Sequence, residues 1–289
     1  YTYHNYTNAP QASPTETIST CPQSPLDRSV HQYGVDYIEI RCSGKWILSF
    51  TGSTQTRLIP ADPYSGSYAF WSNKGDMSDM TLTREFDFTA IQAPITFTYH
   101  TWYDLEKDYD YVYLEASDDG GVTWQILTTP SGTAEDPSGN SYGWGYNGTS
   151  NGWIEEQVDL SQFAGKKVQI RFEYVTDAAV NGEGFLVDDV RIAAAGYSSD
   201  FEADGGGWQA NGFVRVQNAL PQSFRLALIR QGSQTTVEMI PLNPDQTAEI
   251  NLELSSGESA VLVVSGTTRF TREQAAYQIE VRSAQAFER

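Results

Sequence analysis

The sequence is poor in the residue types that build metal-dependent active sites. Its 289 residues include only two cysteines and three histidines. None of the histidines (His4, His31 and His100) is followed by glutamate. The H-E-x-x-H helix of zinc peptidases needs two histidines one turn apart and a glutamate base, so this stretch of chain cannot form it. A Ser–His–Asp triad is not expected either, since each histidine is predicted to be a surface or half-buried residue.

Basic residues and long apolar runs are also scarce. The 18 lysines and arginines are outnumbered by 37 aspartates and glutamates, for a net charge of −19. A nucleic-acid partner is therefore not expected, because binding the phosphate backbone requires a basic face. No apolar run approaches the ~18–20 residues of a membrane-spanning helix. No signal peptide is visible and residue 1 is Tyr, so we expect a processed or excised chain whose targeting segment lies upstream.

Aromatic residues, by contrast, are abundant at 13%, with 17 Tyr and 7 Trp. Aromatic and β-branched side chains suit pleated, half-buried strands. Residues 167–175 show the period of two most clearly, since Val168, Ile170 and Phe172 share one face and charged or polar residues the other. Similar short runs recur along the chain without convincing helices. The predicted fold class is all-β, with tandem β-sandwich domains.

Changes in composition divide the chain into four predicted segments. Residues 1–30, rich in Thr, Ser, Pro and Asn, predict an extended N-terminal arm. Residues 31–65 predict a small β unit, in which Ser43-Gly44-Lys45 turns the chain between two alternating strands. Strand patterns in residues 66–197 predict a jelly-roll-like sandwich, and those in residues 198–289 predict an immunoglobulin-like sandwich. The arm either packs on its own domain or adds a strand to a neighbouring copy.

The two cysteines, Cys21 and Cys42, either remain buried thiols or form one disulfide. We favour the disulfide, because the acidic surface, rich in Tyr, Asn and Thr, is typical of proteins outside the cell. Closing this loop would stabilise the fold by on the order of 3 kcal/mol.

A tight turn is predicted between two strands at residues 117–124. Its sequence follows S-x-D-x-G-x-T-W, which resembles the Asp-box. In that motif the Ser and Asp side chains bond turn amides, Gly adopts positive φ and Trp packs beneath. The residues concerned are Ser117, Asp119, Gly121, Thr123 and Trp124. A turn of this kind is structural and indicates an extracellular β-sheet rather than an active site.

Carboxylates are concentrated between residues 71 and 197, which carry 7 basic and 21 acidic side chains. Acidic residues spaced by two at a loop-to-strand junction can converge on one cation, and Ca²⁺ accepts about six to eight oxygens with loose geometry. The predicted ligands of structural calcium are Asp76, Asp79, Asp104, Glu106, Asp108, Asp110, Asp188 and Asp189. The alternative is that these acids are solvated turn residues. No motif selects two of them as a glycosidase pair.

Aromatic residues in loops are candidates for ligand contact, because an exposed ring can stack on a sugar. The Gly-rich loop with Tyr142, Trp144 and Tyr146 is the predicted contact surface, with its ligand undetermined. Core packing is expected for four other tryptophans, Trp71, Trp102, Trp124 and Trp153.

Long blocks of the sequence resemble the C-terminal part of secreted M6-type metallopeptidases, the immune inhibitor A family. These blocks are residues 71–87, 101–124 and 152–192, and the likeness continues through residues 206–229 and 260–281. The resemblance implies a jelly-roll module that lies downstream of a zinc catalytic domain. Because H-E-x-x-H is missing, the resemblance covers only the non-catalytic part of the family.

Two functions fit these observations, and neither makes the chain an enzyme by itself. The first is an extracellular structural or adhesive protein, stabilised by calcium, that self-associates through its N-terminal arm into a cell-surface or filament assembly. The second is an accessory module of a secreted M6-like metallopeptidase that docks carbohydrate or a protein surface. The absence of a catalytic motif favours the first, and the family resemblance favours the second.

Overall fold

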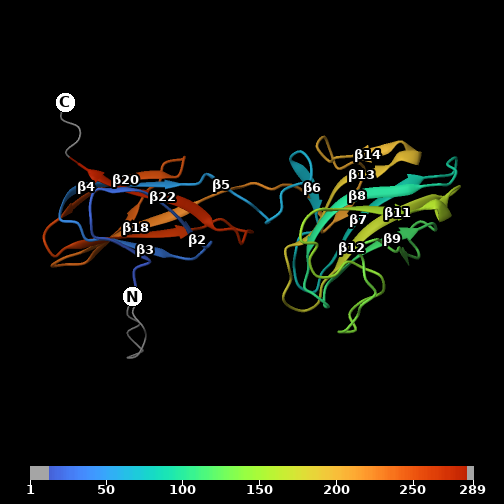
Figure 1. Cartoon of the computed structure of the whole chain (residues 1–289), viewed down its shortest axis with the longest axis horizontal. Coiled ribbons are helices and arrows are strands. Elements are labelled where there is room, and N and C mark those ends of the chain that lie inside the picture. The colour runs from blue at the N-terminus through green and yellow to red at the C-terminus, as the bar shows by residue number, and fades with distance from the viewer. Residues whose placement is uncertain (1–12, 285–289) are drawn as a thin grey trace. The chain divides into compact units, whose positions relative to one another are not determined.

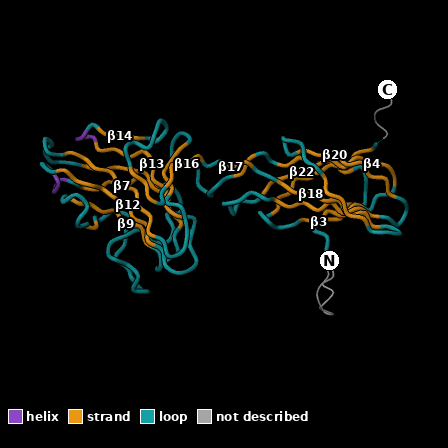
Figure 2. Tube along the Cα trace, turned by 180° about the vertical axis from the view of Figure 1, so that it is seen from behind, coloured by secondary structure: helices purple, strands orange, loops and turns teal. Residues whose placement is uncertain are grey.

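The computed structural model describes residues 13–284, which belong to two compact units. Unit 1 combines both ends of the chain, up to Ile59 and from Ala219, whereas unit 2 comprises Pro60–Asn218. Strands dominate both units, and the described helices are two short 3-10 turns, η1 (Ser161–Phe163) and η2 (Ala193–Ala195) (Figure 2). Neither has the length or apolar character to cross a membrane. The predicted all-β fold with tandem sandwiches is confirmed.

Unit 2 consists of two antiparallel sheets. The five-stranded sheet has, in spatial order, β10 (Gln125–Ile126), β9 (Tyr111–Ser117), β12 (Lys167–Val175), β7 (Asp79–Asp87) and β15 (Gln209–Asn211). The six-stranded sheet has β11 (Ile154–Asp159), β8 (Thr96–Asp104), β13 (Gly184–Ile192), β6 (Tyr68–Trp71) and β16 (Val214–Gln217), and β14 (Tyr197–Ser199) pairs with β13.

The core of unit 2 is aromatic and lies between its two sheets. Phe172 of β12 lies 6.1 Å from Phe97 of β8 and 5.8 Å from Phe185 of β13, measured between ring centroids. All three side chains are fully buried. The alternating pattern of residues 167–175 therefore has the predicted consequence, since its apolar residues face the opposite sheet.

Unit 1 is a second sandwich, built from strands near the two ends of the chain. Figure 1 shows strands coloured blue and red side by side in it. One sheet has β1 (Glu16–Ile18), β3 (Asp36–Ile40), β21 (Ser259–Gly266), β18 (Phe224–Gln231) and β19 (Thr236–Ile240). The other has β2 (Gln23–Val30), β22 (Ala275–Ser283), β4 (Gly44–Gly52) and β20 (Thr247–Leu254), and a short ribbon pairs β5 (Gln55–Thr56) with β17 (Leu220–Pro221).

This architecture corrects the predicted domain boundaries. Residues 16–30 are not a separate arm, because they form β1 and β2 of unit 1, and residues 1–12 of the predicted arm lie outside the described part of the chain. Residues 31–59 are not a separate β unit either. The strands on either side of Ser43-Gly44-Lys45 enter different sheets, β3 beside β21 and β4 beside β22 and β20. Residues 198–218 belong to unit 2 rather than to the C-terminal sandwich.

The predicted disulfide between Cys21 and Cys42 is present, with a Cα–Cα distance of 6.0 Å. Cys21 lies between β1 and β2, and Cys42 lies between β3 and β4. At both places the chain passes from one sheet of unit 1 to the other. The disulfide therefore joins two neighbouring sheet-to-sheet crossings, where no strand ladder holds the chain.

The turn at residues 117–124 has the hydrogen bonds that its sequence predicts. The backbone amides of Val122 and Thr123 both donate to Asp119 Oδ1 at 3.0 Å, and the amide of Gly121 donates to Ser117 Oγ at 2.8 Å. Gly121 has φ +88°, a conformation that costs glycine little. Hydrogen bonds from Thr123 and Ser117 hold the pKa of Asp119 well below its ordinary value. Trp124 is half-buried under the guanidinium of Arg171, 3.9 Å from its ring centroid.

Candidate functional site

Three carboxylates meet where the loop before β9 approaches the loop after β12. One oxygen from each of Glu106, Asp110 and Asp177 lies within 4.8 Å of the other two. Asp110 is almost completely buried and accepts hydrogen bonds from Tyr174 Oη at 3.1 Å and from the amide of Asp177 at 2.9 Å. Glu106 Oε2 is buried without a hydrogen-bond partner. This acidic cluster is an arrangement of oxygen donors that suits a hard cation.

The environment of the acidic cluster disfavours negative charge. Burial raises the pKa of Asp110 to about 6, although its hydrogen bonds from Asp177 and Tyr174 oppose the rise. Burial, followed by the charges of Asp177 and Asp76, raises the pKa of Glu106. Both shifts express the free energy of holding carboxylates close together away from water, which a bound cation would relieve.

The other predicted calcium ligands are spread over several places. Asp76 lies beside the cluster, where it accepts a hydrogen bond from Asn181 Nδ2 at 2.6 Å and raises the pKa of Glu106. Asp104 accepts a bond from the amide of Glu183 at 3.3 Å. Four further residues have other surroundings. Asp108 is bonded to Asn147, and Asp79 is exposed at the start of β7. Asp188 lies on β13 opposite His100, and Ser65 is bonded to both Asp188 and Asp189.

Asp177 joins the cluster although the sequence analysis did not select it. It comes two residues after β12, the strand that pairs with β9, and Asp110 directly precedes β9. An acid that follows one strand and an acid that precedes its antiparallel neighbour meet at the same sheet end. Asp177 could therefore be predicted as a member of the cluster only once β9 and β12 are known to be neighbouring strands.

Of the three aromatic residues in the Gly-rich loop that are predicted to contact a ligand, only Tyr142 is exposed to solvent. Tyr142 is 71% exposed and its ring stacks on that of Tyr113. Trp144 is half-buried, with Nε1 donating to Thr129 O at 3.0 Å. Tyr146 is a core residue, which corrects its predicted surface role: its hydroxyl lies 2.5 Å from that of Tyr99, and its pKa is raised by burial.

The same loop contains the letters G-x-S-x-G, at residues 139–143. In hydrolases this pattern places a serine at a sharp turn between a strand and a helix. Here it lies in a loop without a helix, and Ser141 Oγ donates to Gly143 O at 2.7 Å. The hydrogen bonds of Ser141 in the structure involve Asp136 and Gly143 rather than a histidine. The match therefore does not form a nucleophile site.

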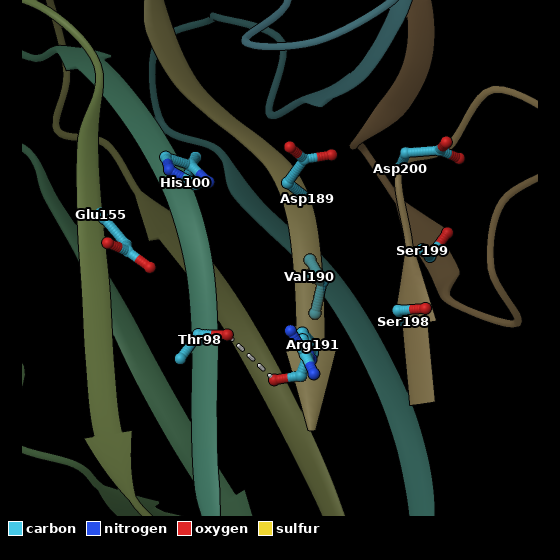
Figure 3. Close-up of a pocket in the computed structure, with 9 residues that line it drawn as sticks. All are labelled: Thr98, His100, Glu155, Asp189, Val190, Arg191, Ser198, Ser199 and Asp200. Atoms are coloured by element: carbon cyan, nitrogen blue, oxygen red, sulfur yellow. Dashed lines mark hydrogen bonds between the residues drawn. The ribbon is translucent and has the colours of Figure 1, made fainter. Parts of the chain in front are cut away.

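A groove of about 400 Å³ lies on the six-stranded sheet of unit 2, over β8, β11, β13 and β14 (Figure 3). Its charged side chains are Glu155, Asp189 and Asp200, against the single cation Arg191. His100 lines the groove, and its Nδ1 atom is buried without a hydrogen-bond partner. The lining thus combines an excess of carboxylates with the imidazole of His100.

An aromatic group adjoins this acidic groove. The ring of Tyr64 stacks on the imidazole of His100, with centroids 3.6 Å apart and planes inclined by 11°. Trp153 meets Tyr64 edge-on at 5.9 Å and donates from Nε1 to Asp62 O. Tyr64 keeps 47% of its surface exposed. Trp153 was expected in the core, and neither Tyr64 nor His100 was selected from the sequence. The pairing of β8 with β11 brings Trp153 near His100, and the loop before β6 adds Tyr64.

Comparison with known proteins places unit 2 in a family. The sequence model described as "Immune inhibitor A-like, MAM domain" matches residues 51–218, which is more than half of the chain and includes all of unit 2. Immune inhibitor A of Bacillus thuringiensis subsp. alesti is 36% identical over 146 residues, covering 48% of this chain and 20% of that protein. Pre-pro-metalloprotease PrtV of Vibrio cholerae serotype O1 is 31% identical over 134 residues, covering 46% and 14%.

Bacillopeptidase F of Bacillus subtilis strain 168 is 24% identical over 158 residues, covering 52% of this chain and 10% of that protein. The chain thus spans between 10% and 20% of the length of these relatives. The likeness is confined to part of each of these relatives. The family model matches residues 51–218, which include the whole sandwich of unit 2, and this match shows that the chain belongs to the immune inhibitor A-like MAM domain family.

Proposed function

We propose that this chain is a non-catalytic docking module of a secreted metallopeptidase-like protein, and that it binds carbohydrate through the groove on unit 2. The observation that carries the proposal is the Tyr64–His100 stack beside the acidic groove. The family relationship supports the accessory role, because the match covers only 14% of a relative named as a metalloprotease and 10% of one named as a bacillopeptidase. An extracellular location fits the same relationship and the disulfide.

The groove chemistry favours a ligand rich in hydroxyl groups. Carboxylates such as Glu155 and Asp189 accept hydrogen bonds from hydroxyls, and two acceptors spaced across strands can engage one sugar ring. The exposed part of Tyr64 offers apolar surface against which a pyranose can pack. Small-molecule sites typically combine such a surface with a few convergent polar groups. A protein surface is the alternative ligand class.

Binding to polysaccharides tests this proposal. Affinity electrophoresis against a panel of neutral and amino-sugar polysaccharides should retard the full chain. Tyr64→Ala and Glu155→Gln should each weaken retardation by about tenfold, since each removes a contact of roughly 1 kcal/mol or more. Tyr142→Ala is the matched control, because it removes an exposed tyrosine from a different loop. Equal loss in Tyr142→Ala, or binding of basic peptides without polysaccharide, would contradict the assignment.

We also propose that the acidic cluster of Glu106, Asp110 and Asp177 holds a structural Ca²⁺, with Asp76 beside it. The support is the convergence of one oxygen from each of the three carboxylates, together with the fact that Glu106 Oε2 is buried without a hydrogen-bond partner. A divalent cation would neutralise carboxylates whose pKa values burial has raised. The cation would also join the loop before β9 to the loop after β12.

Calcium titration tests the cation site separately from the groove. Isothermal titration with Ca²⁺ should show one site, and a chelator should lower the melting temperature of unit 2. Asp110→Asn should remove the heat of binding, whereas Asp79→Asn, an exposed acid outside the cluster, should leave it unchanged. A melting temperature that ignores both calcium and chelator would exclude a structural role.

Assembly through the N-terminal arm has weaker support than docking. Residues 16–30 are occupied in β1 and β2 of their own unit, so they are not available to add a strand elsewhere. A surface or filament role through the arm would depend on residues 1–12. Deleting residues 1–12 and measuring mass by light scattering tests it, because an arm-mediated assembly would dissociate.

A further inference from the structure

Strand β19 is an open edge of unit 1 that carries large exposed apolar side chains. It ends the five-stranded sheet and pairs only with β18 among the described strands. Val237 and Met239 are 65% and 67% exposed. An edge strand offers unpaired backbone amides and carbonyls, and apolar side chains beside them make it a template for a further strand.

The apolar surface continues inward from this edge along two rows. Val237 lies across from Ile229 of β18, which lies across from Val261 of β21. Met239 lies across from Ala227, which lies across from Val263. Both rows are on the outer face, since the intervening residues Leu226 and Leu228 are buried in the core. The rows are open at the edge, where Val237 and Met239 are exposed, whereas Ala227, Ile229 and Val263 are half-buried and Val261 is buried. Exposed apolar side chains that adjoin one another are typical of an interaction surface.

The other three edges of the unit 1 sheets have features that oppose strand addition. β1 is only three residues long. β2 contains Pro25 and a register shift between Gln23 and Leu26. The outward residues of β20 include Glu249 and Glu253, which are exposed. Short strands, proline, bulges and charges are the devices by which edges avoid pairing. The edge strand β19 has one charged side chain, Glu238, which is paired with Arg230, and it carries the large exposed apolar residues Val237 and Met239.

Charge points to a second copy of unit 1 as the partner. By sequence, unit 1 has 10 basic and 12 acidic side chains, whereas unit 2 has 8 and 25. Like-charge repulsion therefore opposes association through unit 2 but hardly affects unit 1. The outer face of β19 is also self-complementary: Val237 and Met239 lie one residue on either side of Glu238 and share that face, so an antiparallel copy centred on Glu238 would set apolar against apolar.

We propose that two copies of this chain associate by antiparallel pairing of β19 with β19, centred on Glu238. This register places Val237 of each copy opposite Met239 of the other and joins the apolar rows of the two sheets. The two Glu238 side chains would face each other, an arrangement of like charges that is normally unfavourable. Arg230 compensates each of them, since its Nη2 lies 3.2 Å from Glu238 Oε1 on the inner face.

Sedimentation equilibrium of the full chain tests the interface. The chain should dimerise as its concentration rises, and Val237→Lys and Met239→Lys should each weaken dimerisation by about tenfold or more, because each replaces buried apolar surface with a charge. Val122→Lys is the matched control, since Val122 is 80% exposed on a turn of unit 2. A monomer at every concentration would overturn the proposal, as would dimers that both β19 variants leave intact.

Cross-linking tests the register independently of affinity. Paired residues on antiparallel strands have Cα atoms about 4.5–5.5 Å apart, within the range that a disulfide spans. Glu238→Cys should therefore give a covalent dimer under mild oxidation, whereas Val237→Cys should not, because its copy lies about two residues away along the strand. Cross-linking at Val237 but not at Glu238 would refute the register. A stable heteromer with an unrelated extended peptide at β19, with the chain otherwise monomeric, would refute the self-association.

Discussion

Asp188 offers the sharpest test of how unit 2 tolerates buried charge. Its side chain is fully buried on β13, where Oδ2 accepts a hydrogen bond from the Ser65 amide at 3.2 Å and Oδ1 accepts one from the Asp189 amide at 2.8 Å. Burial raises its pKa from 3.8 to about 7, despite these hydrogen bonds. We predict that Asp188→Asn changes the pH dependence of stability more than it changes stability at any single pH.

The magnitude follows from two opposing terms. A rise of the pKa from 3.8 to about 7 corresponds to about 4 kcal/mol at 1.36 kcal/mol per pKa unit. Asparagine removes this penalty, but its amide nitrogen cannot accept the second backbone hydrogen bond, a loss of about 1–3 kcal/mol. At pH 8 the variant should therefore be more stable than the wild type by about 1–3 kcal/mol, and at pH 4 less stable by a similar amount.

The sign follows from proton binding. Between pH 4 and 7 the unfolded chain has lost the Asp188 proton while the folded chain keeps it, so the contribution of this group to stability falls as the pH rises. Below about pH 4 Asp188 is protonated in both states, so it adds no pH dependence to stability. Above its folded pKa it is ionised in both states, and its contribution to stability is fully lost. Urea denaturation from pH 4 to 8, followed by tryptophan fluorescence, measures how the stability of unit 2 depends on pH, because six of the seven tryptophans lie in unit 2.

Asp159→Asn provides the control with the opposite sign. Asp159 is exposed at the end of β11, and hydrogen bonds from Ser161 lower its pKa, so its contribution is lost as the pH falls. If the stabilities of the Asp188→Asn variant and the wild type stay parallel from pH 4 to 8, the reasoning about burial is refuted.

Three further predictions concern the scaffold, and each is checked by urea denaturation. Replacing Cys21 and Cys42 together with serine should destabilise unit 1 by about 3 kcal/mol, since the loop that they close spans 21 residues; an unchanged midpoint for unit 1 would contradict the role of the crossings. Phe172→Ala should destabilise unit 2 by about 3–5 kcal/mol, because the ring is fully buried among other aromatic rings. Glu173→Gln should stabilise unit 2 increasingly as the pH rises, because burial and the neighbouring Glu115 raise the pKa of Glu173; a flat difference between pH 5 and 9 would show that Arg171 already compensates both acids.

Much of the local structure was predictable because its causes are local. The alternation in residues 167–175 determines which face of β12 is buried, whatever lies opposite. The turn at residues 117–124 closes through its own side chains, so Ser117 and Asp119 could be assigned without knowing the neighbouring strands. The disulfide followed from there being one pair of cysteines in a chain with extracellular character.

The candidate site was predictable only in part. Glu106 and Asp110 are four residues apart and share one loop, so their proximity could be expected. Asp177 joins them through strand pairing across more than 60 residues. Strand pairing likewise brings His100 and Trp153 together, and a loop distant in sequence adds Tyr64. Tyr146 was assigned wrongly because the loop's glycines suggested exposure, whereas its ring is held in the core by Tyr99.

The sequence by itself determined the all-β class, the buried faces of the strands, the closed turn and the excess of negative charge, because these depend on residues close together in the chain. Only the tertiary structure decided which strands are neighbours. It placed β2, β3 and β4 beside β22, β21 and β20 from the other end of the chain, so that both ends of the chain form one sandwich and unit 2 is inserted between them in sequence. A strand of alternating pattern can bury its apolar face beside many different neighbouring strands, so the packing of the whole fold selects which strands pair.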